Sequence, residues 1–332
     1  MSLREVEVKY PGIDWLDYSN TLLAPHSRVE LDELVNVVVP SFLEEFIQLI
    51  KKTPKRVLAN YVFWRVASSS ASFLGKRVQD IALELEAALT GMSKREPRWK
   101  ECISEASESL FIAAGALYVR RDFNESFKAS TIDIIRNIRK SFKSIVMQAS
   151  WIDKKTKTSA LEKLDWIVQH IAYPSEFLDN DKLDEFYKLL KIYPESYFKS
   201  QLSLNLFNAA YVFEKFNDPV NKTNWISHGR SAIVNAFYDP TENSIQFPVG
   251  ILQGHLFAQD RPKYLNYGAI GYIMGHEITH GFDDEGRQFD KNGNLFEWWE
   301  PETKEKYLQR AQCIVDQYSN YTVKEINLKL LL

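Results

Sequence analysis

The stretch Leu265-Asn-Tyr-Gly-Ala-Ile-Gly-Tyr-Ile-Met-Gly-His-Glu-Ile-Thr-His-Gly281 decides the fold. Its apolar residues and regularly placed glycines predict a helix that packs closely against a neighbouring element. Nine of the 13 glycines in the chain lie between Gly229 and Gly293. Because glycine is needed where the backbone turns sharply or is closely approached, we expect specialised geometry in the last third. The first two thirds are expected to be plain scaffold.

Within this helix lies the pattern His-Glu-x-x-His, from His276 to His280. A helix brings positions i and i+4 to one face, so both imidazoles can reach the same ion. Zinc accepts neutral histidine nitrogens, and its catalytic sites use three protein ligands plus water. Glu277 stands beside the first histidine, where it can take a proton from the attacking water. The alternative is a coincidental pair of histidines, which the apolar, glycine-rich surroundings make the weaker interpretation.

Two carboxylates, Asp283 and Asp284, follow the helix directly and can orient a ligand histidine through its second nitrogen. The alternative is that they only form a turn at the end of the helix. We interpret the other four histidines as structural, namely His26, His170, His228 and His255. For His228 and His255, an approach to substrate stays open.

The size and charge of the chain limit the classes of protein to which it can belong. With 332 residues, 45% of them hydrophobic, it is long enough for two domains or one large domain. The net charge of −3 gives no field that favours nucleic acid as a partner. The longest uncharged apolar stretch, Phe111–Val119, is about half of the length that a membrane span needs. No leader sequence and no transmembrane segment are predicted within the chain.

Apolar periodicity predicts a series of helices before residue 217. Their approximate ranges are 41–52, opened by a capping box at Ser41, then 54–89, 132–145, 161–171, 183–190 and 200–216. Two β-rich runs, 232–238 and 244–247, are joined by turn-forming residues and predict a hairpin.

Eight motifs in order make the chain resemble the neprilysin and endothelin-converting-enzyme family of zinc metallopeptidases, family M13. They are Pro11–Trp15, Arg98–Cys102, Trp151–Asp153, Asn235–Tyr238, Phe247–Gln253, Leu265–Gly268, Gly275–Gly286 and Trp298-Trp299. The resemblance implies a mainly α fold that is α+β in its catalytic part. Residues 1–217 would be a helical N-terminal lobe. Residues 218–332 would be a partial thermolysin-like lobe with a short substrate-binding hairpin.

The same resemblance implies a zinc-dependent endopeptidase that cuts peptides on the amino side of hydrophobic residues. It assigns one Zn²⁺ to His276 and His280, the general base to Glu277, and support of a ligand histidine to Asp284. It implies that Asn235 and Ala236 grip the peptide main chain, in keeping with a strand edge that extends a bound peptide. It assigns the hydrophobic specificity pocket to Ile251, Leu256, Tyr272 and Ile273.

Some parts of the family pattern have no counterpart here. The third zinc ligand of the family is a Glu in a Gly-Glu-Asn-x-Ala-Asp motif, and Glu297, Glu300 and Glu325 lack that setting. We therefore expect the chain alone to bind zinc weakly and to have little or no peptidase activity. The alternative is a non-catalytic product that binds peptides or a partner. The family's partner for Cys313 is also missing, which predicts an unpaired or exposed thiol.

The family resemblance also implies a location. It indicates a type II ectodomain at the plasma membrane or a secreted protein, with membrane contact only through an N-terminal anchor. Sequons permit glycosylation without indicating it, at Asn124, Asn221 and Asn320. Peptides are the expected partners, and nucleic acid is not.

Overall fold

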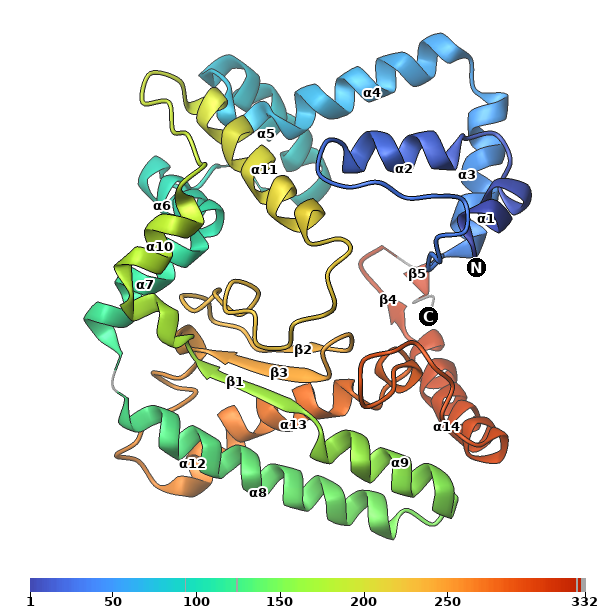
Figure 1. Ribbon diagram of the computed structural model, residues 1–332, viewed down its shortest axis with the longest axis vertical. Helices are drawn as coiled ribbons and strands as arrows, with labels where there is room; N and C mark the ends of the chain where they lie inside the picture. The colour runs from blue at the N-terminus through green and yellow to red at the C-terminus, as the bar shows by residue number, and fades with distance from the viewer. Residues whose placement is uncertain (93, 124, 327, 330–332) are drawn as a thin grey trace. The chain divides into compact units, whose positions relative to one another are not determined.

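The computed structural model describes residues 1–92, 94–123, 125–326 and 328–329 as a mainly helical chain (Figure 1). The chain forms two compact units. Unit 1 comprises Met1–Ile103 and Phe186–Pro219, and unit 2 comprises Ser104–Glu185 and Val220–Leu332. The expected mainly α, α+β fold is confirmed. The division into regions 1–217 and 218–332 stays a prediction, and the compact units are cut differently because residues 104–185 pack with the later segment.

Unit 1 is built from helices around a small apolar core. The helices are α1 (Leu3–Lys9), α2 (Trp15–Leu23), α3 (Pro40–Lys52), α4 (Lys55–Ser69), the 3₁₀ turn η1 (Ala71–Phe73), α5 (Lys76–Thr90) and α11 (Tyr197–Glu214). Helix α6 (Arg98–Ser109) starts in this unit and α10 (Asn180–Tyr187) ends in it. Leu3 and Val6 of α1, with Tyr10 directly after it, pack against Leu23 and Ile47, which fixes the first three helices together.

Unit 2 contains the mixed part of the fold. Its elements are α7 (Phe111–Asp122), α8 (Ser126–Gln148), α9 (Lys154–Asp165), β1 (Val168–Ala172), η2 (Ser175–Leu178), β2 (Phe237–Asp239), β3 (Ser244–Pro248), η3 (Val249–Ile251), α12 (Lys263–Gly268), α13 (Ile270–His280), η4 (Gly286–Gln288), α14 (Pro301–Ser319), β4 (Thr322–Val323) and β5 (Leu328–Lys329). Helix α8 contacts both α13 and β1, and α13 contacts β2 (Figure 1). The sheet therefore has these two long helices packed beside it.

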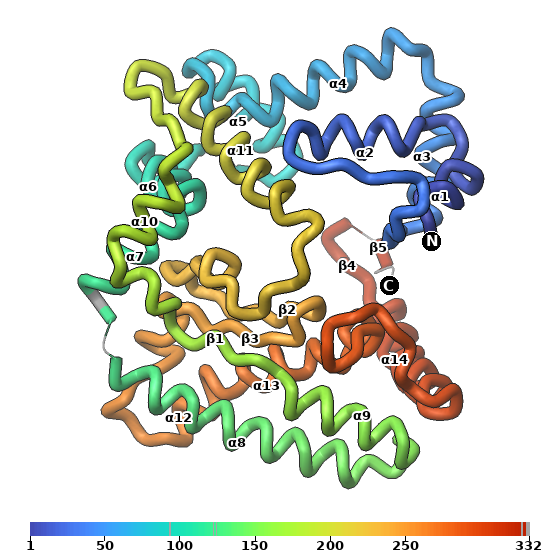
Figure 2. Tube along the Cα trace, in the orientation of Figure 1, coloured from blue at the N-terminus to red at the C-terminus, as the bar shows by residue number. Residues whose placement is uncertain are grey.

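The three-stranded sheet has the order β1-β3-β2. Strand β1 pairs in parallel with β3, with Ile171 opposite Phe247, and β2 pairs with β3 in the antiparallel sense. Strand β3 is central and almost wholly buried, with Ile245 and Phe247 fully enclosed. Strand β2 lies at an edge of this sheet, and among the described strands it pairs with β3 alone. Figure 2 traces the chain through these strands.

The hairpin is confirmed, but its first strand is only Phe237–Asp239, so residues 232–236 of the expected run are not strand. The helix over 132–145 is confirmed as part of α8. The helix expected over 161–171 is wrong beyond Asp165, because residues 168–172 gain ladder hydrogen bonds by pairing with β3. The helix expected over 54–89 is two helices separated by η1, and the one over 265–281 is broken at Ala269. The capping box at Ser41 is also wrong: α3 starts at Pro40 and has no side-chain cap.

Several sequence features lie on the surface of these units. Cys102 and Cys313 are free and exposed, as expected for Cys313. The sequon residues Asn221 and Asn320 are exposed, and Asn124 lies outside the described residues. No single helix in the described ranges is long and apolar enough to cross a membrane. One adjoining pair, Arg98–Ser109 with Phe111–Arg121, meets that test by length and composition, and only across a sharp bend.

A buried hydrogen-bond junction joins α9 to α14. The Asp153 carboxylate caps α9 by accepting hydrogen bonds from the backbone N–H groups of Lys155 (2.8 Å) and Thr156 (2.9 Å). It also accepts from the hydroxyl of Thr303, which is fully buried in α14, at 2.5 Å. Burial by itself raises the pKa of Asp153, but these hydrogen bonds to the charged form prevail and lower it to about 2.

We predict that Asp153→Ala lowers the free energy of unfolding at neutral pH by about 2 kcal/mol, because it removes a helix cap and the acceptor of the buried Thr303 hydroxyl, which keeps only the backbone N–H of residue 153 as a partner. The pKa of about 2 lies below the usual 3.8, so the charged form stabilises the fold above pH 3.8. This contribution is lost as the pH falls through 2. The stability gap between wild type and variant should therefore shrink on acidification.

Urea titrations of both proteins at neutral pH, and thermal melts at decreasing pH, measure this difference. The matched control is Asp133→Ala, which removes an exposed ion pair with Arg136 on α8. Its effect should stay within about 0.5 kcal/mol. Equal losses of stability in the two variants would contradict the capping role of Asp153.

Candidate metal centre and substrate cleft

The two histidines of the His-Glu-x-x-His pattern lie together on one face of α13. Their Nε2 atoms are 3.0 Å apart, His276 is exposed, and His280 is partly buried. Bonds of about 2.0–2.1 Å to a tetrahedral zinc ion put two ligand atoms about 3.3 Å apart. The pair therefore fits a zinc ion with only a small outward shift of the imidazoles.

An aspartate fixes the tautomer of the second histidine. The Nδ1–H of His280 donates to Oδ2 of Asp283 at 2.7 Å, which leaves the Nε2 lone pair for a metal. The other oxygen of Asp283 accepts the backbone N–H groups of Glu285 (3.1 Å) and Gly286 (2.8 Å). The resemblance favoured Asp284 for this role, but Asp284 is exposed and the hydrogen bond goes to Asp283. Asp283 comes three residues after His280, and this i, i+3 spacing brings its carboxylate within reach of the His280 ring.

Glu277 is the buried member of the pattern, with only 5% of its surface exposed. Burial raises the pKa of Glu277, and the neighbouring His276 and His280 act in the opposite direction. A carboxylate that is poorly hydrated binds a proton more readily than one in water. Glu277 thus has the environment of a base close to two candidate ligands.

The cleft around these side chains has a volume of about 350 Å³. It is lined by Asn235, Ala236, Phe237, Tyr238, Pro240, His276, Glu277, His280, Asp283, Glu285 and Gly286. Six of the residues singled out in the sequence thus meet in one place. They come from two segments of the chain. Asn235 and Ala236 directly precede the edge strand β2, and the other four belong to the end of α13 and the loop after it.

The residues assigned to the hydrophobic pocket do not line this cleft. Ile251 is 3% exposed and belongs to the core, whereas 74% of Tyr272 is exposed on α13. Leu256 and Ile273 are partly buried and are also outside the cleft lining, as is Asp284. The specificity assignment of these residues therefore stays a prediction without support from the cleft.

Sequence reasoning gave no role of their own to two residues at the cleft. Tyr238 lines it, and Lys163 binds the loop that borders it. The Tyr238 hydroxyl donates to the Asn243 side chain at 3.0 Å, and burial raises the pKa of the phenol well above its usual range. Lys163 is buried in α9, where its Nζ donates to the carbonyls of Gly286 (2.6 Å) and Phe289 (2.7 Å). Burial lowers the pKa of Lys163 to about 8. Only the folded chain brings Lys163 to a loop more than a hundred residues away, so no local pattern reveals it.

A third ligand does not complete this centre within the described residues. No acidic or cysteine side chain there lies close enough to both imidazoles to form a three-ligand group. The substitutes considered from the sequence have other partners, since Glu297 pairs with Lys304 and Glu300 pairs with Lys155. The centre as described thus offers two nitrogen ligands and a nearby base.

Comparison with known proteins gives the same family over two segments. Residues 1–174 and residues 235–329 each match a family model described as peptidase family M13. Neprilysin-2 of Drosophila melanogaster is 48% identical over 337 aligned positions, which cover 98% of this chain and 44% of that protein. Human endothelin-converting enzyme 1 is 36% identical, covering 96% of this chain and 42% of that protein. The chain spans less than half the length of these relatives.

Solved structures with the same fold include two bacterial proteins. The zinc metalloprotease Zmp1 of Mycobacterium tuberculosis, in complex with an inhibitor, is 27% identical with a TM-score of 0.81, covering 98% of this chain and 47% of that one. PepO of Lactobacillus rhamnosis is 24% identical with a TM-score of 0.80, covering 99% and 50%. The second similarity concerns the fold alone.

We predict that Lys163→Met lowers the free energy of unfolding by about 2–4 kcal/mol. The methionine fills a similar volume but leaves two carbonyl groups without their charged donor. The loop that carries Asp283 should loosen, and zinc should bind more weakly. Chemical denaturation and zinc titration measure both effects.

The control is Lys143→Met, which removes an exposed ion pair with Asp165. It should change the free energy of unfolding by less than about 0.5 kcal/mol. A Lys163→Met protein as stable as this control would show that Lys163 does not hold the loop.

Proposed function

Because the chain belongs to peptidase family M13, we propose that the cleft is the zinc site of a metalloendopeptidase. The observation that carries the proposal is the 3.0 Å approach of the His276 and His280 nitrogens beside the buried Glu277. These are the donor types, and the separation, that a catalytic zinc ion uses. The cleft is also lined by Asn235 and Ala236, which lead into the edge strand β2.

In the proposed reaction His276 and His280 hold the ion, and Asp283 keeps the His280 Nε2 lone pair available. Zinc, when bound, acts as a Lewis acid on the attacking water and on the peptide carbonyl. Glu277 takes the proton of the water as its oxygen attacks the carbonyl carbon, and then delivers a proton to the departing amine. The raised pKa of Glu277 supports both halves of this transfer.

The peptide substrate is proposed to lie along strand β2. This strand is at the edge of its sheet, and the cleft lining runs from Asn235 to Tyr238. An extended peptide can add to such an edge through main-chain hydrogen bonds. The Asn235 side chain already accepts the Ala236 N–H at 2.9 Å, so the free backbone groups around it are held in a fixed orientation. Cleavage on the amino side of hydrophobic residues is proposed from the family resemblance alone.

The chain by itself is proposed to hold zinc weakly at this centre and to hydrolyse peptides slowly. Catalytic zinc sites use three protein ligands, and the described residues supply two. The same observation favours the second candidate, a module that binds peptides without cutting them. An extracellular location, anchored or secreted, is proposed from the resemblance.

We predict that His280→Ala removes the weak zinc binding at this centre, and that the wild-type chain slowly hydrolyses a short peptide rich in hydrophobic residues. A chelator should stop the hydrolysis. Glu277→Gln should slow it by about 10²-fold or more, because the general base is removed while the ligands remain. Zinc titration and fluorogenic peptide assays measure these effects.

The control is Glu302→Gln on the exposed side of α14, which should match wild type in both assays. Hydrolysis that survives the chelator or the Glu277→Gln change would contradict the proposed mechanism. Rapid hydrolysis by the wild-type chain would contradict its weak zinc binding. Peptide binding without any hydrolysis would favour the binding module.

A further inference from the structure

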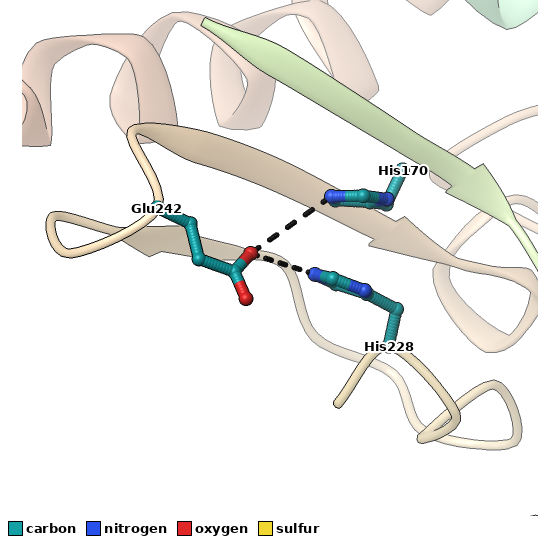
Figure 3. Close-up of side chains that lie close together, drawn as sticks. All are labelled: His170, His228 and Glu242. Atoms are coloured by element: carbon teal, nitrogen blue, oxygen red, sulfur yellow. Dashed lines mark hydrogen bonds and ion pairs between the residues drawn. The ribbon is translucent and has the colours of Figure 1, made fainter. Parts of the chain in front are cut away.

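A second cluster of metal-binding side chains lies in unit 2, apart from the His-Glu-x-x-His centre. It consists of His170 on β1, His228 in the loop before β2, and Glu242 in the hairpin turn (Figure 3). One ligand atom from each of the three lies within 4.8 Å of the others. His228 and Glu242 are each only 7% exposed, so this is not a solvated surface group.

The hydrogen bonds of His228 define what its second nitrogen can do. Its Nδ1 is 2.8 Å from the backbone carbonyl oxygen of Asn224, which can only accept, so Nδ1 carries a proton. In a neutral ring Nε2 is then a lone pair, yet it faces Oε2 of Glu242 at 2.9 Å. Two acceptors at that distance repel each other unless a cation stands between them. The cation is either a proton, carried by His228 or by the Glu242 carboxyl, or a metal ion.

His170 distinguishes these two possibilities. Its Nε2 is buried, has no hydrogen-bond partner among the described residues, and lies 4.0 Å from the same Oε2 of Glu242. A proton on His228 would satisfy the contact with Glu242 and leave the His170 nitrogen unpaired, at a cost typical of an unsatisfied buried group. A metal ion would satisfy all three atoms at once.

The surrounding contacts hold the three side chains in place. The Ser244 hydroxyl donates to Oε2 of Glu242 at 2.9 Å, and the Gln246 amide donates to the backbone carbonyl of His228 at 2.9 Å. Gln246 is also the register partner of His170 across the β1–β3 ladder. The strand pair therefore positions both histidines.

We propose that His170, His228 and Glu242 form a second site for a divalent transition-metal ion of the zinc class. Imidazole nitrogens and a carboxylate oxygen are the donors that zinc accepts, and a tetrahedral ion puts them about 3.3 Å apart. Oε2 of Glu242 lies 2.9 Å from Nε2 of His228 and 4.0 Å from Nε2 of His170, on either side of this value. The two rings are stacked at 3.4 Å with 18° between their planes, so one ring must tilt for both lone pairs to meet.

A metal ion there would join β1, the loop before β2 and the turn of the β2–β3 hairpin. The segment between His228 and β2 includes Asn235 and Ala236, which line the cleft beside His276 and His280. The histidines also line a separate cavity of about 510 Å³, which gives the ion access to solvent and room for a fourth ligand. The site would stabilise the strand edge that is proposed to receive the peptide.

The test uses a variant in which the first centre is removed, His276→Ala/His280→Ala. Equilibrium dialysis against Zn²⁺ should still give about one ion per chain, and zinc should raise the Tm of this protein. Adding His170→Ala should weaken zinc binding by at least tenfold and remove the Tm shift. Because His170 makes no other hydrogen bond that the structure describes, this change should preserve the fold.

The matched control adds His255→Ala instead, which removes an exposed loop histidine and should leave zinc binding unchanged. Co²⁺ provides a second readout, since ligation by these side chains gives visible d–d absorption that His170→Ala should abolish. The proposal is overturned if the double variant binds no zinc, or if zinc binding is equal with and without His170. Failure here leaves the first centre unaffected, because its histidines are absent from every protein compared.

Discussion

The candidate centre depends on the two hydrogen bonds that the buried ammonium group of Lys163 donates. The ammonium group lies in the interior of unit 2 and donates to the carbonyls of Gly286 and Phe289, at the end of the loop that follows α13. Leaving a buried charge there is costly unless its hydrogen bonds are satisfied, so the loop is held at this one position. Asp283 lies in the same loop. Its Oδ1 accepts the backbone N–H of Gly286, and its Oδ2 accepts the Nδ1–H of the His280 ring. The orientation of a candidate metal ligand is thereby linked to the packing of α9.

The pairing of β1 with β3 imposes the second constraint. Strand β3 is paired on both sides, so β1 and β2 are the edge strands of this sheet, and β2 contacts α13. The same pairing brings His170 opposite Gln246, and hence beside the loop that carries His228. One small sheet therefore positions both the strand edge that is proposed to receive the peptide and the cluster of His170, His228 and Glu242.

Local sequence patterns predicted the parts of the fold and the site that local interactions determine. The His276–His280 spacing and the long helix over 132–145 follow from residues three or four positions apart, so they could be read directly. The hairpin pairs residues five to nine positions apart and could be read from its turn. The segment 168–172 could not, because its helix-like spacing was overruled by ladder hydrogen bonds to a strand more than seventy residues later. The choice between Asp283 and Asp284 was open to local reasoning, because the carboxylate that reaches the His280 ring belongs to the residue three positions after it.

The two histidine clusters differ in the same way, and the difference explains why only one carries a recognisable motif. The first takes its histidines from one helix, so the backbone hydrogen bonds of α13 fix their separation whether or not a metal is present. The second takes its ligands from a strand, a loop and a turn, and only tertiary packing holds them together. A cluster of that kind gains more rigidity from an ion, because the ion replaces contacts that the backbone does not supply. A buried nitrogen without a partner, as at His170, is therefore a more informative sign of such a site than spacing along the chain.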